Sequence, residues 1–331
     1  MCTLPSHLSR RRALQGSAAA LVVLGLLMWW LLPVGPSAPR GSVTFSTGVR
    51  TGVYQLYGKL LKPTLAHDLP GVTIDLQPSE GSQQNLARVA AGKADFTIAT
   101  ADAIAQYIAD GKPGADRLRG CARLYDDYVQ LAVDNGSAVQ RAGDLRHKRV
   151  AVGQPGSGVR LIADRVLRAA GLDPQKDITA VPAGIDTDPA LLEAGKIDAF
   201  FWSGGLPTDA VRDLAARHPI RLVPLDDLVT RLHAGGGTTR YYRAAAIPGD
   251  AYREARNNGP VSTVAVANVL VTTDREDPEL TKGFTRSVIR SRDRIGRQVH
   301  AAQLVDVRTA IYTDPLKLHE GARRYYRSVK P

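Results

Sequence analysis

Two short motifs occur twice in this chain at almost the same separation. In the first pair, Gly158 follows Gly52 by 106 positions. In the second pair, Gly195 follows Gly92 by 103 positions. Two matched pairs at nearly one offset predict two similar lobes, each with its own sheet, and chance similarity of two short motifs is the alternative. The pairs are TGVRTGV (47–53) with GQPGSGV (153–159), and AAGKADFTI (90–98) with EAGKIDAFF (193–201).

From residue 41 the chain alternates between strand and helix patterns. Apolar residues at every second position in VTIDLQ (72–77) predict a strand, and helical spacing over 159–170 predicts a helix that Gly171 ends. This alternation is typical of parallel α/β sheets, and 331 residues suit about two domains. We therefore expect four parts: a signal peptide or membrane anchor (1–40), lobe 1 (41–130), lobe 2 (131–230), and a crossover with C-terminal helices that brace both lobes (231–331).

The glycine-rich turn before residue 159 does not fit a nucleotide site. The two residues after Gly158 are Val and Arg, where a phosphate-binding loop needs Lys and then Ser or Thr. Ser157 is flanked directly by glycines, so it does not fit the G-x-S-x-G nucleophile turn. The seven histidines show no metal-binding spacing, and the only cysteines are Cys2 and Cys121. We expect no catalytic residue, no metal and no cofactor, and hence no enzyme.

The N-terminal residues have the pattern of a targeting segment. Three arginines (10–12) precede an apolar run from 13 to 32, which is long enough to span a bilayer. The stretch SRRRALQ (9–15) resembles a twin-arginine signal, and the general secretory route is the alternative. The best small-residue cleavage position, Ala38, has prolines close on both sides, which suits signal peptidase poorly. We expect an exported, extracytoplasmic protein that residues 13–32 anchor to the cytoplasmic membrane unless they are cleaved.

Positive charge exceeds negative charge along the chain, with 43 Lys and Arg against 32 Asp and Glu. The excess is mostly arginine and is scattered, which makes nucleic acid an unexpected partner. Two interpretations remain open: an arginine-rich solvated surface, or attraction to an anionic membrane surface. We expect the protein to be a monomer.

The two glycine turns are expected to face each other across a cleft, because ligands of open parallel sheets bind outside the carboxyl ends of the strands. A helix N-terminus behind glycines presents free N–H groups and partial positive charge to an anion. Ser157 and the N–H groups around Gly158 would bind a ligand carboxylate from one lobe. Thr51 and Gly52 would bind it from the other lobe. A cleft without a nucleophile predicts binding and not catalysis.

Several longer stretches carry a family resemblance. They include STGVRTGVYQLYGKL, EGSQQNLARVAAGKADFTIATADAIAQY, LRHKRVAVGQPGSGVRLIADRVLRAAGL, EAGKIDAFFWSGGLPTDAVRDLAARHPIRLVPLDD and AAIPGDAY. Over nearly all of residues 42–275 the chain resembles the TAXI family, the extracytoplasmic solute-binding subunits of tripartite ATP-independent periplasmic (TRAP) transporters. The resemblance implies a two-lobed α/β, periplasmic-binding-protein-like (type II) fold with a ligand cleft between the lobes. It also implies that the protein delivers a small carboxylate, such as glutamate or another amino or organic acid, to a separate polytopic TRAP-type permease.

The chain departs from the family pattern at the expected cleft. Arg50 stands where a threonine is usual, and it is either a bidentate carboxylate clamp or an exposed loop arginine. Glu80 replaces a glycine, and it either repels an anion or recognises an ammonium group. Tyr54 either closes over the ligand or packs the helix start. The cleft positions that the resemblance implies are Thr47, Gly48, Thr51, Gly52, Val53, Tyr54, Gly81, Ser82, Asn85, Gly156, Ser157, Gly158, Gly204, Gly205 and Pro207. The alternative function is a membrane-anchored ligand-sensing or interaction subunit outside any transporter.

Overall fold

The computed structural model describes residues 22–24 and 38–329. The chain divides into two compact units, Met1–Ser37 and Ala38–Pro331. The expected signal peptide or anchor lies outside the described residues, apart from 22–24, which are helical and exposed, and 38–40. Within these described ranges, no helix is long and apolar enough to cross a membrane. The second unit carries the fold.

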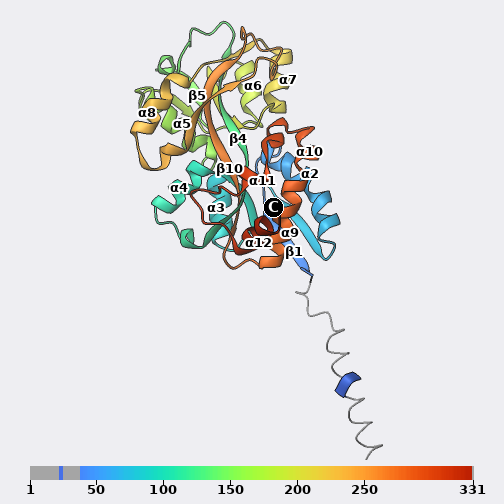
Figure 1. Cartoon of the computed structure of the whole chain (residues 1–331). Coiled ribbons are helices and arrows are strands. Elements are labelled where there is room, and N and C mark those ends of the chain that lie inside the picture. Colours follow the sequence, from blue (N-terminus) through green and yellow to red (C-terminus); the bar gives the residue numbers. More distant parts are fainter. Residues whose placement is uncertain (1–21, 25–37, 330–331) are drawn as a thin grey trace, which may run out of the picture. The chain divides into compact units, whose positions relative to one another are not determined.

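Lobe 1 is built on three parallel strands connected by helices (Figure 1). The middle strand β1 pairs with β2 on one side and with β3 on the other. Alternate residues of β1, Val43 and Phe45, are buried in the apolar core, as expected for a strand with helices packed on it. The elements are β1 (Gly41–Ser46), α2 (Val53–Asp68), β2 (Val72–Gln77), α3 (Ser82–Ala90), β3 (Phe96–Thr100) and α4 (Ala101–Ala109).

Lobe 2 repeats this arrangement with its own parallel strands, and β5 pairs with β6 on one side and β7 on the other. Its apolar core is a separate cluster that includes Ile162, Val166, Phe200 and Phe201. The elements are β5 (Arg149–Ala151), α5 (Gly158–Ala169), β6 (Thr179–Val181), α6 (Asp188–Glu193), β7 (Ala199–Gly204), α7 (Asp209–Arg217), β8 (Ile220–Leu222), α8 (Val229–Ala234) and β9 (Tyr242–Ile247).

Two long strands, β4 (Leu118–Asp134) and β10 (Val261–Thr273), run through both lobes and pair with each other (Figure 1). The end of β4, Tyr128–Val133, pairs with β7 of lobe 2. The start of β10, Val261–Val266, pairs with β9 of lobe 2, and its later residues Asn268–Val271 pair with β3 of lobe 1. All ten strands are therefore joined in one hydrogen-bonded sheet. The expectation of a separate sheet in each lobe is wrong, because the chain crosses between the lobes in strand conformation.

The crossing strands are irregular where they pass between the lobes. The pairing of β10 with β4 shifts register between Ala267 and Val269, and again between Leu270 and Val271. Each shift leaves one extra residue on β4, which is the geometry of a β-bulge and bends a strand locally. The first bulge lies beside Asn268 and close to Asp127, so both side chains belong to the region where the two lobes meet.

The C-terminal helices pack on lobe 1. We expected residues 231–331 to brace both lobes, and the buried apolar side chains after Pro278 belong to the core of lobe 1. Phe284 of α9 stacks on Phe96 of β3 with ring centroids 4.1 Å apart. The elements are α9 (Pro278–Arg290), α10 (Arg292–Gly296), α11 (Val307–Ala310) and α12 (Glu320–Val329). Figure 1 shows α9 and α12 together with α2 and β1, away from α5 to α8.

Candidate functional site

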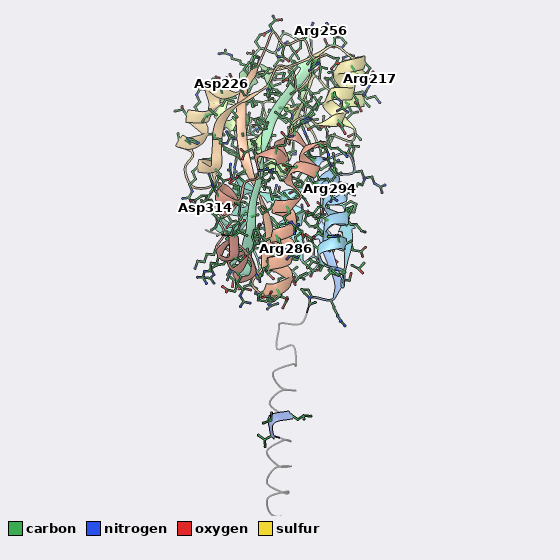
Figure 2. All side chains as sticks on the ribbon, turned by 45° about the vertical axis from the view of Figure 1, so that its right-hand side comes forward. Arg217, Asp226, Arg256, Arg286, Arg294 and Asp314 are labelled. Carbon is green, nitrogen blue, oxygen red and sulfur yellow. The ribbon has the colours of Figure 1, made fainter. Side chains whose placement is uncertain are left out.

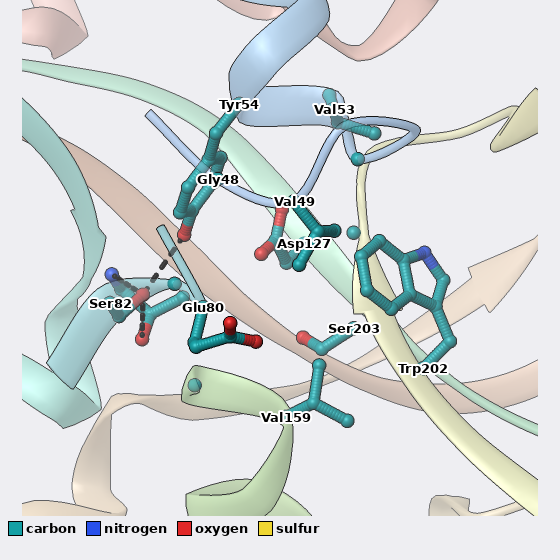
Figure 3. Close-up of a pocket in the computed structure, with 15 residues that line it drawn as sticks. Gly48, Val49, Val53, Tyr54, Glu80, Ser82, Asp127, Val159, Trp202 and Ser203 are labelled. Carbon is teal, nitrogen blue, oxygen red and sulfur yellow. Dashed lines mark hydrogen bonds between the residues drawn. The ribbon is translucent and has the colours of Figure 1, made fainter. Parts of the chain in front are cut away.

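A cavity lies between the lobes, where four helices begin (Figure 3). Helices α2, α3 and α4 reach it from lobe 1, and α5 reaches it from lobe 2. The cavity has a volume of about 50 Å³, which is enough for a few water molecules. Its lining consists of Gly48, Val49, Gly52, Val53, Tyr54, Glu80, Gly81, Ser82, Thr100, Asp127, Gly158, Val159, Trp202, Ser203 and Gly204.

Three of the helix starts around this cavity lack a side-chain cap, and the first turn of α4 carries one acid, Asp102. The residues before α2, α3 and α4 are Gly52, Gly81 and Thr100, and none of the three caps its helix with a side-chain hydrogen bond. The first backbone N–H groups of a helix have no partner inside the helix, and the helix dipole adds partial positive charge there. The lining therefore offers N–H donors to an anionic group of a ligand from several directions.

Asp127 of the crossing strand β4 is the most unusual group in the lining. The side chain of Asn268, on the other crossing strand, donates from Nδ2 to Asp127 Oδ1 at 2.7 Å. Tyr54 donates from its hydroxyl to Asn268 Oδ1 at 2.5 Å. Burial raises the pKa of Asp127 to about 7; the hydrogen bond from Asn268 lowers the pKa, and the charges of Asp126 and Asp102 raise it. At neutral pH this carboxyl group is close to the midpoint of its titration.

Tyr54 links this chain of hydrogen bonds to the start of α3. Its hydroxyl lies 3.1 Å from Ser82 Oγ, and Ser82 Oγ accepts from the backbone N–H of Thr100 at 3.2 Å (Figure 3). Burial and then the charge of Asp127 raise the pKa of Tyr54, so its phenol is neutral. These contacts hold the Tyr54 ring against one wall of the cavity, with its hydroxyl turned towards both crossing strands.

The charges of the lining are one-sided. Asp127 and Glu80 are its two carboxyl groups, and none of the described lining residues is Lys, Arg or His. Trp202 of lobe 2 covers one side, with its indole N–H donated to Thr208 at 2.9 Å. The hydroxyl of Ser203 is buried and has no hydrogen-bond partner within the described part of the chain. The side chains can thus bind a cationic group, and the helix starts can bind an anionic group.

The part of the chain that the structure describes offers no metal site of the usual kind. In residues 22–24 and 38–329, no group of three or more His, Cys, Asp or Glu side chains is placed to hold a metal ion.

Half of the expected cleft residues line this cavity. Two of them show how closely the lobes approach: a Cβ atom on Gly81 would lie 3.4 Å from the backbone nitrogen of Gly158. A Cβ atom on Gly158 would lie 3.1 Å from Ser82 Oγ. The starts of α3 and α5 therefore meet across the cleft at glycines. The expected residues in the lining are Gly48, Gly52, Val53, Tyr54, Gly81, Ser82, Gly158 and Gly204.

Two other expected residues, Thr47 and Asn85, lie beneath the lining and are fully buried. Asn85 donates to the backbone oxygen of Thr47 at 2.7 Å and to that of Ile98 at 3.1 Å. The Thr47 hydroxyl donates to Gln55 and to the backbone oxygen of Gln77. Their polar atoms are used to join β1 with its neighbouring helices, so these residues support the lining without facing a ligand.

The lobe 2 residues before α5 also differ from the expectation. Ser157 donates from its hydroxyl to the backbone oxygen of Gln154 at 2.7 Å and accepts from the N–H of Arg160 at 3.0 Å. It is therefore an N-cap of α5, and its hydroxyl is turned to its own helix. The backbone oxygen of Gly156 accepts from Gln84 of lobe 1 at 3.0 Å. Neither residue is in the cavity lining.

The expected residues after β7 are divided between the lining and the wall behind it. Gly204 lines the cavity, and Gly205 does not. A Cβ atom on Gly205 would lie 3.2 Å from the ring of Tyr125. Pro207 follows a cis peptide bond after Leu206 and is also outside the lining.

Arg50 and Thr51 lie outside the cavity, on the exposed side of the lobe 1 turn. Thr51 donates from both its backbone N–H and its hydroxyl to Asp186 of lobe 2, and the backbone bond measures 3.1 Å. Thr51 thus connects the lobes next to the cavity instead of lining it. The side chain of Arg50 belongs to two open surface hollows outside the cavity.

Seven lining residues were not among the expected cleft positions: Val49, Glu80, Thr100, Asp127, Val159, Trp202 and Ser203. A signal for Asp127 was present, because two adjacent acids interrupt the apolar strand LYDDYVQLAV. Charged side chains inside an apolar strand are costly and therefore mark a special environment. No comparable signal marks Ser203 or Thr100.

Comparison with known proteins identifies the fold and a family. Residues 45–329 match the model of the NMT1-like family. A solved structure from Bordetella bronchiseptica RB50 is 18% identical, with a TM-score of 0.52 over 88% of this chain and 90% of that one. An ancestral arginine-binding protein bound to arginine is 15% identical, with a TM-score of 0.50 over 78% of this chain and 98% of that one. The periplasmic aliphatic sulphonate binding protein from Escherichia coli is 14% identical, with a TM-score of 0.46 over 81% and 76%. The first two likenesses show a two-lobed, periplasmic-binding-protein-like α/β fold, as expected from the sequence.

Proposed function

Since this chain belongs to the NMT1-like family, we propose that it is an extracytoplasmic solute-binding protein whose interlobe cavity captures an amino acid. The two lobes close over a small ligand, and the ligand is released again without being changed. The function is binding and not catalysis. Within the range of carboxylates that the sequence suggested, the cavity favours a zwitterion over a simple organic acid.

The observation that carries this proposal is the charge of the lining. Asp127 and Glu80 face the same space as the starts of four helices, and no cationic described side chain joins them. A ligand with carboxylates alone would meet two acidic groups without a compensating cation, which is costly in a desolvated site. An amino acid matches both sides: its ammonium group pairs with a carboxylate, and its carboxylate accepts from helix N–H groups.

The partner of this binding protein is proposed from the sequence. The motifs that resemble the TAXI family support delivery of the ligand to a polytopic permease of the TRAP type. The apolar run 13–32 behind three arginines supports an extracytoplasmic location and a membrane anchor. The protein would act as a monomer, without a cofactor and without nucleic acid as a partner.

A thermal-shift screen of residues 38–331 tests the proposal. Each amino acid is paired with the acid that lacks its amino group, for example glutamate with glutarate and alanine with propionate. A ligand at about 100 times its Kd should stabilise the protein by about 2.7 kcal/mol. We expect a shift with at least one amino acid and none with its deaminated analogue. Equal shifts with both members of the pair would contradict the role of the acidic lining, and no shift with any amino acid or organic acid would contradict the function.

A further inference from the structure

The excess positive charge of the protein lies in its C-terminal segment. Residues 41–277 contain 27 Lys and Arg and 27 Asp and Glu. Residues 278–331 contain 12 Lys and Arg and 5 Asp and Glu. The chain from 41 onwards is therefore neutral over both lobes, and its whole surplus belongs to the segment that packs on the outside of lobe 1. An evenly spread arginine-rich surface would not produce this division.

Within that segment, α9 and α12 lie side by side and place exposed arginines on neighbouring faces. Arg286 and Arg290 are one turn apart on α9, and Arg323 and Arg327 are one turn apart on α12. Tyr325 of α12 shows how near the helices are: burial raises its pKa, and the charges of Arg286 and Arg290 act against that rise. We call these four arginines, together with Arg40 at the start of β1, the α9–α12 surface.

Most of this charge is not neutralised by the protein itself. Within the described residues, no carboxylate lies within 4.0 Å of Arg286, Arg290 or Arg327, whereas Arg323 pairs with Glu320. Arg286 has only a long contact of 3.5 Å to the backbone oxygen of Asp68. Burial raises the pKa of the Asp68 carboxyl, but hydrogen bonds and the charges of Arg290 and Arg286 lower it below its usual value. The exposed guanidinium groups are thus free to bind phosphate groups from outside.

The same surface lies beside the place where the folded unit begins. Leu69, which follows α2, packs closely on α9. A Cβ atom on Gly283 of α9 would lie only 2.6 Å from Leu69 Cδ2. Two residues further on, a Cβ atom on Gly71 would lie 2.7 Å from the backbone oxygen of Pro39. Leu69 therefore contacts α9, and Gly71, two residues later, contacts Pro39 and Arg40, so Arg40 lies close to α9. In Figure 2, Arg286 lies at the end of the unit where β1 starts, and Arg256 lies at the opposite end.

We propose that the α9–α12 surface docks on an anionic phospholipid membrane, with its arginines bound to lipid phosphates. Eight residues, 33–40, separate the apolar run 13–32 from β1. Fully extended, eight residues span at most about 29 Å. An anchor in 13–32 would thus hold this end of lobe 1 near the bilayer, and the charge of the surface is complementary to acidic headgroups. Each arginine at such a surface strengthens binding by about fivefold, corresponding to about 1 kcal/mol.

Vesicle binding by residues 38–331 tests this docking without the apolar run. This part is one compact unit that contains all three apolar cores. We expect it to sediment with vesicles of phosphatidylcholine and phosphatidylglycerol, but not with phosphatidylcholine alone. Added salt should release it, because exposed charges are screened beyond about 8 Å at physiological ionic strength. The double variant Arg286→Glu and Arg290→Glu should bind at least about 25-fold more weakly.

The matched control changes the same charge at the other end of the unit. Arg253 and Arg256 of lobe 2 are exposed and, among the described residues, have no carboxylate within 4.0 Å. Arg253→Glu with Arg256→Glu should keep vesicle binding within about twofold of the wild type, since these charges lie far from the surface. Thermal unfolding of both double variants checks that they are folded. Equal losses in the two variants, equal binding to both kinds of vesicle, or no binding to acidic vesicles at low salt would each overturn the proposal.

Discussion

The two lobes start their first helices with related glycine turns, yet the turns have different tasks. In lobe 1, the turn before α2 and the first two residues of α2 together contribute five residues, from Gly48 to Tyr54, to the cavity lining. The turn before α5 in lobe 2 contributes no lining residue, and α5 itself contributes only its first two residues, Gly158 and Val159, while Ser157 caps the helix. The carboxyl groups of the lining are Glu80 of lobe 1 and Asp127 of the crossing strand β4. Lobe 2 contributes Trp202 and the backbone of Gly158, which lies close to lobe 1.

This difference shows which feature of the repeated segment the fold requires in both lobes and which features can differ between them. Both lobes need a glycine turn because a strand must turn sharply into a helix at the same sheet edge. The side chains around the turn are under no such constraint. We therefore expect substitutions in lobe 1 and on β4 to change ligand affinity, and equivalent substitutions in lobe 2 to change stability or closure.

The largest expected effect is at Asp127. Asp127→Asn keeps the size of the side chain but removes the negative charge that would face a ligand ammonium group. Loss of one partner of a buried charge pair costs about 2–5 kcal/mol, so affinity should fall by at least about 30-fold. Calorimetric titration with the amino acid found by screening measures it. The neighbouring variant Asp126→Asn is the control, because Asp126 pairs with Arg123 and Arg243 outside the cavity.

Asp127 also makes wild-type binding depend on pH. Its pKa is raised to about 7 in the unliganded protein, and only the ionised carboxylate can pair with an ammonium group. Affinity should be highest between about pH 7 and the pKa of the ligand's ammonium group, and it should fall by about tenfold for each pH unit below about 7. The Asn variant should lose this dependence. An unchanged affinity in the variant, or the same pH profile, would place the ammonium site elsewhere.

Gly158→Val tests whether the start of α5 in lobe 2 must lie close to α3 of lobe 1 for the ligand to bind. A Cβ atom at this position would lie 3.1 Å from Ser82 Oγ across the cleft, so a branched side chain should hold the lobes apart. Overpacking of this kind costs about 1–3 kcal/mol, which predicts about 10- to 100-fold weaker binding. Gly158→Ala should show a smaller loss in the same titration. Equal affinity of all three proteins would show that closure does not bring α3 and α5 together.

Asp188 of lobe 2 is a buried carboxyl outside the cavity, and its substitution should affect stability alone. Burial and the charge of Asp186 raise its pKa from the ordinary 3.8 to about 7, and both oxygens lack a partner among the described residues. A raised pKa stabilises the protein fully below the unfolded value, and this contribution is lost as pH rises through the folded value. Asp188→Asn should therefore raise the free energy of unfolding at about pH 8 by about 4 kcal/mol, and much less at about pH 4.

Urea unfolding at both pH values measures the effect of Asp188→Asn, and titration with the ligand should show unchanged affinity. A gain in stability that is the same at both pH values would not come from the titration of this carboxyl. A loss of affinity would mean that lobe 2 contributes a functional acid after all.

The serines at the starts of α3 and α5 form a matched pair. Ser82→Ala removes a hydroxyl of the lining and should weaken ligand binding by up to about tenfold. Ser157→Ala removes the N-cap of α5 and should lower stability by about 1 kcal/mol, with affinity nearly unchanged. Titration and urea unfolding of both variants decide between the roles. Weaker ligand binding by Ser157→Ala than by Ser82→Ala would mean that the serine of lobe 2, and not that of lobe 1, contacts the ligand.

Thr51→Val should have the smallest effect. It removes the hydroxyl bond from Thr51 to Asp186 but leaves the backbone bond of 3.1 Å. Because this contact between the lobes is exposed, we expect the ligand to dissociate only about threefold faster. Thr187→Val is the control, since the Thr187 hydroxyl donates within lobe 2, to the backbone oxygen of Gly184. Stopped-flow dissociation rates that are equal in the two variants would exclude Thr51 as a contact that holds the cleft closed.

Much of the fold could be predicted from the sequence, because its signals are local. Alternating apolar residues, helical spacing and glycine turns set the strands and helices of both lobes, and the repeated motifs showed that there are two of them. The crossing strands could not be predicted in this way. The strand β4 reads as one apolar run, and nothing in its spacing says that one end pairs with β10 and the other with β7. Pairing partners are chosen by packing of segments far apart in the chain.

The sequence by itself determined that this is a two-lobed α/β protein with a glycine turn before the first helix of each lobe. Only the tertiary structure decided which side chains share the cavity. Asp127 and Asn268 are 141 positions apart and meet because two crossing strands pair there. Ser157 was expected in the site on the same grounds as Gly158. Its hydroxyl instead forms hydrogen bonds with the backbone of Gln154 and Arg160, within its own turn and helix. The spacing of residues along the chain decides the local backbone conformation. The surroundings of a polar side-chain atom depend instead on every segment that packs around it.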